Sequence, residues 1–372
     1  MNENEKRLAE TLSRIKAPHI AAMQAMCRRL DSLTKPPGSL GRLEDLAVQL
    51  AGIRGESFPV NTRKKIVVMA ADHGITAEGV SAFPREVTVQ MVANFARGGA
   101  GINVLTRLSG AEVRVVDIGV ASAVAVPGVT GAKVRAGTAN FAREKAMSRE
   151  EALQALVTGI DIAAEEVSAG TAVLGTGEMG IGNTTASSAV AAALTGYSPQ
   201  RLVGPGTGMD EQGVALKAAV VERALALHQP QADQPLEVLS CVGGLEIAGL
   251  AGLIIGAAAS GCPVVIDGFI STVAALVAVR FSAAVLPYII PSHLSREPGH
   301  ALLLEHLELK PYLHLNMRLG EGTGAALAMH LVEAAARIPV EMATFGEAGV
   351  SNKEEGKTDE NLPGAARPHA VE

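Results

Sequence analysis

Short apolar runs alternate with longer, more polar segments from about residue 64 onward. Four of these runs have the length of buried strands: Ile66–Met69, Val113–Val116, Thr171–Leu174 and Pro263–Ile266. Each run is followed by a polar loop and then by a helical pattern. Near-continuous apolar strands that alternate with helices are typical of a parallel sheet with both faces covered. We therefore predict an α/β fold with a Rossmann-like parallel sheet covered by helices.

The two ends of the chain have a different pattern. Residues 5–53 have the periodicity of amphipathic helices, with a break at Lys35–Gly38. Near the other end, Leu313–Met317 is interpreted as a last strand and Ala325–Ile338 as a helix. We predict a helical subdomain over residues 1–60, completed by about 325–347, and an α/β domain over 61–324. Residues 351–372 are too polar to pack and are predicted to form a disordered tail.

One uncharged run, Ile247–Ile266, has the length of a membrane span. Gly261–Pro263 interrupts it, so we expect a buried helix followed by a strand, with no membrane span. Residues 1–14 are charged and lack the apolar stretch of a signal peptide, which favours a cytoplasmic protein. The three scattered cysteines fit a reducing compartment and are interpreted as buried free thiols.

Composition limits the possible ligands. Apolar residues make up 48% of the chain and aromatic residues 3%, and the formal net charge is −6. Because few aromatic rings are available for base stacking and no basic tract is present, nucleic acid is not an expected partner. An anionic ligand must therefore be held by a local site.

Such a site is predicted within Thr171–Ser188, where an apolar run opens into a glycine-rich turn that carries Glu178. Backbone N–H groups and the start of a helix near Asn183 favour a bound phosphate. Gly175, Gly177 and Gly180 also have the spacing of a dinucleotide-binding fingerprint. A dehydrogenase site needs an acidic residue roughly 20 positions further on, and the next carboxylate is Asp210. The fingerprint is therefore weak support for a dehydrogenase.

Polar residues follow the predicted strands, where the carboxyl ends of parallel strands gather and ligands bind. They are Asp72, His73, Asp117, Glu178 and Asp267. For the three aspartates, a helix cap or a turn is at least as good an interpretation. Glutamate is a poor cap, so Glu178 is the stronger functional candidate. A second glycine-flanked glutamate, Glu321, precedes the last predicted helix.

Four segments, taken together, closely resemble the nicotinate-nucleotide–dimethylbenzimidazole phosphoribosyltransferase family: Ala71–Gln90, Gly177–Thr185, Gly204–Gly208 and Arg318–Gly324. The resemblance runs from about Ser39 to Glu347. It implies transfer of phosphoribosyl from nicotinate mononucleotide to 5,6-dimethylbenzimidazole, with inversion at the anomeric carbon. The products are α-ribazole 5′-phosphate and nicotinate, in the nucleotide-loop pathway of cobalamin biosynthesis. The resemblance also implies a homodimer that uses no metal and no cofactor.

The resemblance assigns roles to individual residues. Glu321 is the expected general base, kept ionised by the dipole of the helix that follows it, and Glu178 is expected to orient the ribose or to balance charge. The residues that match the base pocket are Ser81, Phe83, Gln90, Met91 and Leu319. Of these, Gln90 stands in an apolar helix stretch where its amide must find a partner. The residues expected at the nucleotide and its phosphate are Gly180, Gly182, Asn183, Thr184, Thr185, Lys217 and Ser295.

Without the resemblance, simpler interpretations hold for several of these residues. Met91 and Leu319 fit ordinary core packing, and Lys217 fits a solvated helix position. Two other functions stay open on the residues alone: another Rossmann-like nucleotide enzyme, and a nucleotide-binding sensor in which Glu321 only caps a helix. Turnover with nicotinate mononucleotide and a benzimidazole separates these alternatives.

Overall fold

Six parallel strands form one sheet in the computed structural model, which describes residues 1–351 apart from 124 and 207. The strands are β1 (Arg63–Ala71), β2 (Ala111–Gly119), β3 (Thr130–Gly131), β4 (Thr171–Met179), β5 (Val264–Ile266) and β6 (Ile289–Pro291). Their order is β3-β2-β1-β4-β5-β6, and every neighbouring pair is parallel. The predicted α/β fold with a Rossmann-like sheet is confirmed.

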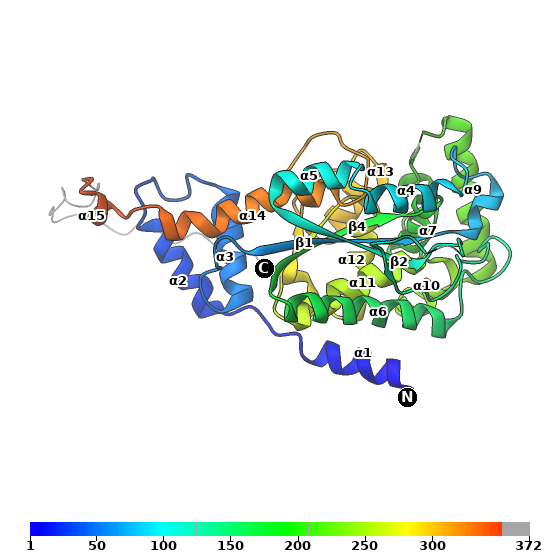
Figure 1. Cartoon of the computed structure of the whole chain (residues 1–372), viewed down its shortest axis with the longest axis horizontal. Coiled ribbons are helices and arrows are strands. Elements are labelled where there is room, and N and C mark those ends of the chain that lie inside the picture. Colours follow the sequence, from blue (N-terminus) through cyan, green and yellow to red (C-terminus); the bar gives the residue numbers. More distant parts are fainter. Residues whose placement is uncertain (124, 207, 352–372) are drawn as a thin grey trace, which may run out of the picture.

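The strand order reverses between β1 and β4. From β1 the chain passes through α4 (Val87–Ala96) and α5 (Gly101–Ser109) to reach β2 on one side. It later returns through α6 (Arg149–Ser168), which lies on the opposite face of the sheet, to reach β4 on the other side of β1 (Figure 1). Loops at such a reversal diverge and leave a crevice at the carboxyl ends of the strands, where ligands of this architecture bind.

Alternation along β1 divides the interior into two cores. Val67, Met69 and Ala71 belong to one, and Ile66 and Val68 belong to the other, because successive side chains of a strand point to opposite faces. The first core is closed by α6, α11 (Leu245–Ala259) and α12 (Phe269–Phe281). The second is closed by α3 (Arg42–Arg54) and α14 (Thr323–Glu341).

Helices α6 and α11 lie in backbone contact with one another. A Cβ on Gly159 would collide with the carbonyl oxygen of Gly249, and a Cβ on Gly252 would collide with that of Leu156. This packing explains the uncharged, glycine-rich run, whose predicted buried helix and strand are α11 and β5. Among the described residues, no helix is long and apolar enough to cross a membrane.

The helices at the chain ends occupy two places. α2 (Ile20–Asp31) packs on α3 and α14 beyond the amino ends of the strands, whereas α1 (Glu3–Ser13) packs on α6 and α11 (Figure 1). The proposed division into a helical subdomain and an α/β domain stays a prediction, and the predicted tail lies beyond the described residues. The remaining elements are η1 (Gly74–Glu78), α7 (Asn183–Thr195), α8 (Pro199–Leu202), α9 (Glu211–His228), α10 (Pro235–Val242), η2 (Ala283–Tyr288), α13 (Pro298–His306) and α15 (Phe345–Ala348).

Two local predictions were wrong. Residues 313–317 form no strand but a loop beside residues 292–297. Isolated hydrogen bonds join the two segments, such as that from the Leu294 N–H to the Leu313 carbonyl (2.8 Å). Leu313 packs only partly buried against the second core, and Leu315 is 53% exposed. The sixth strand is β6, whose three residues are too short a run to be recognised. One of the three cysteines, Cys27, is exposed rather than buried.

The glycine-rich turn is shorter than the sequence predicted. Residues 175–179 continue β4, and the turn consists of residues 180–182. Glycine is needed inside the strand because a Cβ on Gly177 would collide with the backbone of Glu321, and one on Gly175 would collide with Ile66. These glycines allow the start of α14 to approach the strand.

Candidate active site

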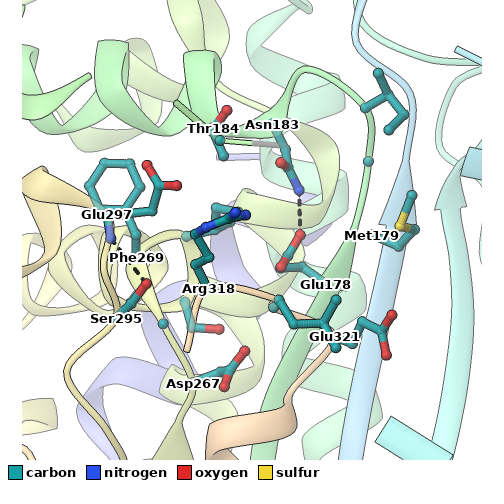
Figure 2. A pocket seen from close by; sticks show the side chains of 18 of the residues that line it. Glu178, Met179, Asn183, Thr184, Asp267, Phe269, Ser295, Glu297, Arg318 and Glu321 are labelled. Atoms are coloured by element: carbon teal, nitrogen blue, oxygen red, sulfur yellow. Dashed lines mark hydrogen bonds between the residues drawn. The ribbon is translucent and has the colours of Figure 1, made fainter. Parts of the chain in front are cut away.

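A cavity of about 290 Å³ opens at the carboxyl ends of β4, β5 and β6 (Figure 2). The first turns of α7 and α12, one face of α4, and residues 318–321 before α14 complete its wall. Its lining residues are Phe83, Val87, Met91, Glu178, Met179, Gly180, Ile181, Asn183, Thr184, Gly206, Asp267, Gly268, Phe269, Ile270, Ser271, His293, Ser295, Glu297, Arg318, Leu319, Gly320 and Glu321. This is the location that the strand reversal predicts.

Glu178 stands at the end of β4 and is only 6% exposed. The side-chain amide of Asn183 donates a hydrogen bond to its carboxyl group (Figure 2). Burial, reinforced by the nearby charges of Asp267 and Glu246, raises the pKa of Glu178 to about 8. Glu178 is therefore mostly protonated at neutral pH and can donate a hydrogen bond to a ligand.

Glu321 lies between two glycines in a turn whose three residues all have positive φ: Gly320 (78°), Glu321 (63°) and Gly322 (94°). A Cβ on Gly320 would collide with Oε1 of Glu178, so this turn brings the two glutamates close together. The carboxylate of Glu321 accepts the backbone N–H of Ile102, at the start of α5, at 3.0 Å.

The prediction that the helix following Glu321 keeps it ionised was wrong. Its side chain points to the N-terminus of α5 rather than to that of α14. Burial raises the pKa of Glu321, the Ile102 amide opposes this rise, and the charge of Asp267 adds to it. Glu321 is thus a stronger base than an ordinary glutamate.

The N-terminus of α14 is capped by Asp267. Its carboxylate accepts the N–H groups of Gly324 (2.7 Å) and Gly322 (3.1 Å), so the helix dipole balances the Asp267 charge. The capping interpretation of Asp267 is confirmed, although at a helix distant in the sequence.

Asp72 and Asp117 have structural partners and do not line the cavity. Asp72 accepts the N–H of Ala121, and Asp117 accepts that of Val120. The turn interpretation therefore holds for Asp117, whereas Asp72 bonds to the segment after β2, 49 residues further on, and not within a local turn. His73 is fully buried behind the turn and pairs with Glu246 at 2.8 Å.

Four of the residues predicted at the nucleotide line the cavity: Gly180, Asn183, Thr184 and Ser295. Gly182 and Thr185 do not. Gly182 is the N-cap of α7 with a φ of 96° and packs against His73, and Thr185 is fully buried. Both shape the start of α7 from behind the wall.

Lys217 is buried rather than solvated, with 1% of its surface exposed. Its Nζ donates to Oγ1 of Thr184 (3.0 Å) and to the carbonyl of Gly204 (3.1 Å). Burial lowers the pKa of Lys217, and the charge of Glu297 opposes this shift. Lys217 therefore lies directly behind Thr184, one side chain away from the cavity.

Phe83, Met91 and Leu319 line the other end of the cavity, and Ser81 and Gln90 do not. The helix α4 presents Val87 and Met91 to the cavity, and Gln90 is rotated about 100° from Met91. Because Gln90 is exposed, its amide can be satisfied by solvent. The expectation that it needs a partner within the fold was wrong.

Several lining residues were missed by the sequence reasoning. Arg318 is the one lysine or arginine that lines the cavity within the described part of the chain, and its side chain extends toward Asn183 (Figure 2). Glu297 is 7% exposed, and burial raises its pKa against the opposing charges of Lys217 and Arg318. Arg318 is the first residue of the recognised Arg318–Gly324 segment, which is the one signal that pointed to it, but it was given no role there. In residues 1–351, apart from 124 and 207, no three His, Cys, Asp or Glu side chains form a cluster able to hold a metal ion.

The doubly wound sheet, the cavity at its reversal and the two carboxyl groups beside a helix N-terminus define a nucleotide-handling α/β enzyme. The chain matches the family described as "Phosphoribosyltransferase" over residues 15–350. It is 55% identical to a nicotinate-nucleotide–dimethylbenzimidazole phosphoribosyltransferase of Chloroflexus aggregans over 349 residues, 94% of this chain and 99% of the relative. It is 54% identical to the protein of the same name from Geobacter sulfurreducens, over 92% of this chain and 98% of that relative.

A solved structure agrees with these relatives. The crystal structure of CobT from Thermus thermophilus superposes with a TM-score of 0.85 at 48% identity, covering 88% of this chain and 99% of that one. The chain belongs to the nicotinate-nucleotide–dimethylbenzimidazole phosphoribosyltransferase family.

Proposed function

We propose that this chain transfers phosphoribosyl from nicotinate mononucleotide to 5,6-dimethylbenzimidazole, in the nucleotide-loop pathway of cobalamin biosynthesis. The products are α-ribazole 5′-phosphate and nicotinate. Relatives that match nearly the whole chain carry the name of this activity. The single observation that supports it chemically is the pair of adjacent glutamates, Glu178 and Glu321, on the wall of one cavity.

Glu321 acts as the general base in this proposal. One ring nitrogen of the benzimidazole attacks C1′ of the ribose while the bond from C1′ to the pyridine nitrogen breaks. The electron pair of that bond neutralises the cationic pyridine ring, so nicotinate leaves without an acid. The N–H on the other ring nitrogen becomes acidic, and the Glu321 carboxylate accepts its proton. Attack opposite the leaving group inverts the anomeric carbon.

Glu178 is less suited to the role of base because it is already mostly protonated at neutral pH, with a pKa raised to about 8. A neutral carboxyl group that donates a hydrogen bond can orient a ribose hydroxyl without repelling the phosphate. The protonation states of the two glutamates therefore favour Glu321 as the base and Glu178 as the hydrogen-bond donor to the ribose.

The two ends of the cavity fit the two substrates. Gly180, Asn183, Thr184 and Ser295 line the end at the α7 N-terminus, where a phosphate is favoured. Phe83, Met91 and Leu319 offer an apolar surface to the flat acceptor. Lys217 supports the phosphate end through Thr184, and Arg318 adds positive charge to the cavity. Ser81, Gln90, Gly182 and Thr185 keep their assigned roles as predictions.

We also propose that the chain works as a cytoplasmic homodimer. Analytical ultracentrifugation of the purified protein at micromolar concentration is expected to give a mass of twice 38.2 kDa. A single species of 38.2 kDa would contradict the dimer without affecting the proposed chemistry.

The deciding experiment measures nicotinate release from nicotinate mononucleotide with and without 5,6-dimethylbenzimidazole, and identifies the nucleotide product by mass. We expect release only when an acceptor is present, and a panel of benzimidazoles and purines ranks the acceptors. A sensor would bind the nucleotide in calorimetry without any release, and that result would overturn the proposal.

A further inference from the structure

His300 on α13 lies just behind the wall of the cavity and is completely buried. Both of its ring nitrogens have hydrogen-bond partners. Its Nδ1 accepts the backbone N–H of Ser295 at 2.9 Å. Its Nε2 lies 2.9 Å from Oγ1 of Thr272 on α12. His300 thus bridges two segments of the chain that follow different strands.

The groups at the two ends of this hydrogen-bond network, the Ser295 N–H and the Gly268 carbonyl, fix the direction of each hydrogen bond in it. The Ser295 N–H can only donate, so Nδ1 of His300 carries the lone pair. At the other end, the Thr272 hydroxyl donates to the Gly268 carbonyl at 2.9 Å, and that carbonyl can only accept. The hydroxyl proton is therefore used, and Nε2–H of His300 must donate to Oγ1. A single neutral tautomer satisfies the whole chain of bonds.

The surroundings of the ring favour the same neutral form. Burial, with a contribution from the neighbouring His293, lowers the pKa of His300 to about 3. The rings of His293 and His300 meet edge to face, with centroids 6.1 Å apart. His300 therefore does not change its charge across the range in which the enzyme works.

The two segments that His300 joins form one wall of the nucleotide end. Ser295 and Gly268 both line the cavity. A Cβ on Gly268 would lie 3.6 Å from Cβ of Ser295, so the Ser295 side chain lies close to the Gly268 backbone. The ladder between β5 and β6 ends at Ile266 and Pro291, and Ser292 adds two bonds beyond it, to the carbonyls of Ile266 (3.1 Å) and Asp267 (3.2 Å), before Gly268 and Ser295 are reached. A connection from behind can therefore fix their separation.

We propose that His300 is a positioning residue whose Nδ1 holds the backbone of Ser295 beside the Gly268 turn, with Thr272 favouring the tautomer that allows this, and that this bond shapes the site for the phosphate of the nucleotide. This inference rests on the proposed function, in which Ser295 contacts that phosphate. It assigns to His300 a purpose beyond filling the core, because a space-filling residue would not need both of its ring nitrogens.

Two variants separate the two bonds. In His300→Asn, Oδ1 takes the place of Nδ1 and still accepts the Ser295 N–H. In His300→Gln, the side-chain amide reaches the place of Nε2 and keeps a donor for Thr272, but the Ser295 N–H loses its acceptor. We expect KM for nicotinate mononucleotide to rise about tenfold or more in the Gln variant, as for the loss of one buried hydrogen bond. We expect a rise of less than about threefold in the Asn variant, for which the acceptor is kept.

KM for the benzimidazole is expected to stay unchanged in both variants. Thr272→Val is the matched control, because it keeps the shape of Thr272 and the bond from the Ser295 N–H to His300, while it removes the bonds of the Thr272 hydroxyl to His300 and to the Gly268 carbonyl. It is expected to behave like His300→Asn. Equal KM values for the Gln and Asn variants, or a change in KM for the benzimidazole instead, would overturn the proposal.

A second measurement on the unaltered protein covers the case in which a variant does not fold. Nitrogen-15 NMR of labelled histidine is expected to show His300 with a protonated Nε2 and an unprotonated Nδ1 from pH 5 to pH 8. A protonated Nδ1 in this range would contradict the bonding pattern. Failure of the proposed function would appear differently, as the absence of nicotinate release by the unaltered chain.

Discussion

A glutamate with a φ of 63° holds the central position in the proposed chemistry. For a residue with a Cβ this conformation costs roughly 1–2 kcal/mol. Strain of this kind persists where the surrounding structure over-determines it, and it gathers at functional sites. Here the Ile102 N–H holds the Glu321 carboxylate, and the flanking glycines let the turn form beside Glu178.

Replacing Glu321 with Gln keeps the size of the side chain and removes the base. Because general-base catalysis contributes about 10²–10⁴-fold, we expect kcat to fall by a factor in that range while KM for both substrates changes little. Since the pKa of Glu321 is raised, kcat of the unaltered enzyme should decline as pH falls, starting at a higher pH than an ordinary glutamate would give. The Gln variant should lack that decline. An undiminished kcat in this variant would move the role of base to Glu178.

Lys217 permits a second test at this scale. Lys217→Met keeps the length of the side chain but leaves the Thr184 hydroxyl and the Gly204 carbonyl without their donor. We expect KM for the nucleotide to rise about tenfold or more, with little change in KM for the base, because a charge-assisted hydrogen bond is worth about 1.5–3 kcal/mol. Initial rates over a grid of both substrates measure the two constants. Lys6→Met, at an exposed position on α1, is the control, and a nucleotide KM equal to that of the control would exclude Lys217 from the site.

At the scale of elements, glycines determine how closely helices and strands approach. Gly159, Gly249 and Gly252 place α6 and α11 in backbone contact, and Gly177 admits the turn before α14. A helix pair this close needs no large side chains between its members, which is consistent with a sequence that has no Trp and only 7 Phe. The close packing at these glycines therefore explains why the sequence has so few large aromatic residues.

Gly252→Ala tests this packing. The new methyl group would collide with the Leu156 carbonyl, so α6 and α11 must separate. Overpacking of this kind typically costs about 1–3 kcal/mol, and we expect the free energy of unfolding in urea to decrease by at least that amount. Gly346→Ala is the control, since a Cβ there meets no atom within 4 Å. Equal stability of the two variants would show that the helices move apart without cost.

At the scale of the whole molecule, the site depends on the reversal of strand order. Met91, Glu178, Asp267 and Glu321 come from four distant parts of the chain and line one cavity. They meet because the carboxyl ends of β4 and β5 lie side by side. Helix α14 begins over these ends, where Asp267 caps its N-terminus. A change in the packing of α14 would therefore affect the position of Glu321 before it affected the sheet.

Removal of residues 352–372 is a prediction for the whole chain. These residues are polar, and the family match ends at residue 350, so we expect kcat, KM and the melting temperature of the shortened protein to stay near those of the full chain. Enzyme assays and calorimetry on residues 1–351 provide the comparison. A melting temperature lowered by more than about 2 °C would indicate that the segment contributes roughly 1 kcal/mol or more to stability.

Much of this protein follows from its sequence. The apolar runs predicted β1, β2, β4 and β5 because buried parallel strands need continuous apolar residues. The glycines around Glu178 and Glu321 marked the two residues that share the cavity wall, since glycine-flanked glutamates are unfavourable for structure alone. The combination of four motifs also identified the family.

Only the tertiary structure decided the rest. The three residues of β6 form a strand because β5 provides a partner, whereas residues 313–317 have the pattern of a strand and no place in the sheet. Burial makes Glu178 a neutral acid, and the start of α5 receives the Glu321 carboxylate. Lys217 and Asp267 owe their roles to partners far away in the chain, and the tautomer of His300 depends on Thr272 of another helix. A local pattern records what a segment can form, while burial, charge state and hydrogen-bond partner depend on which distant segments pack against it.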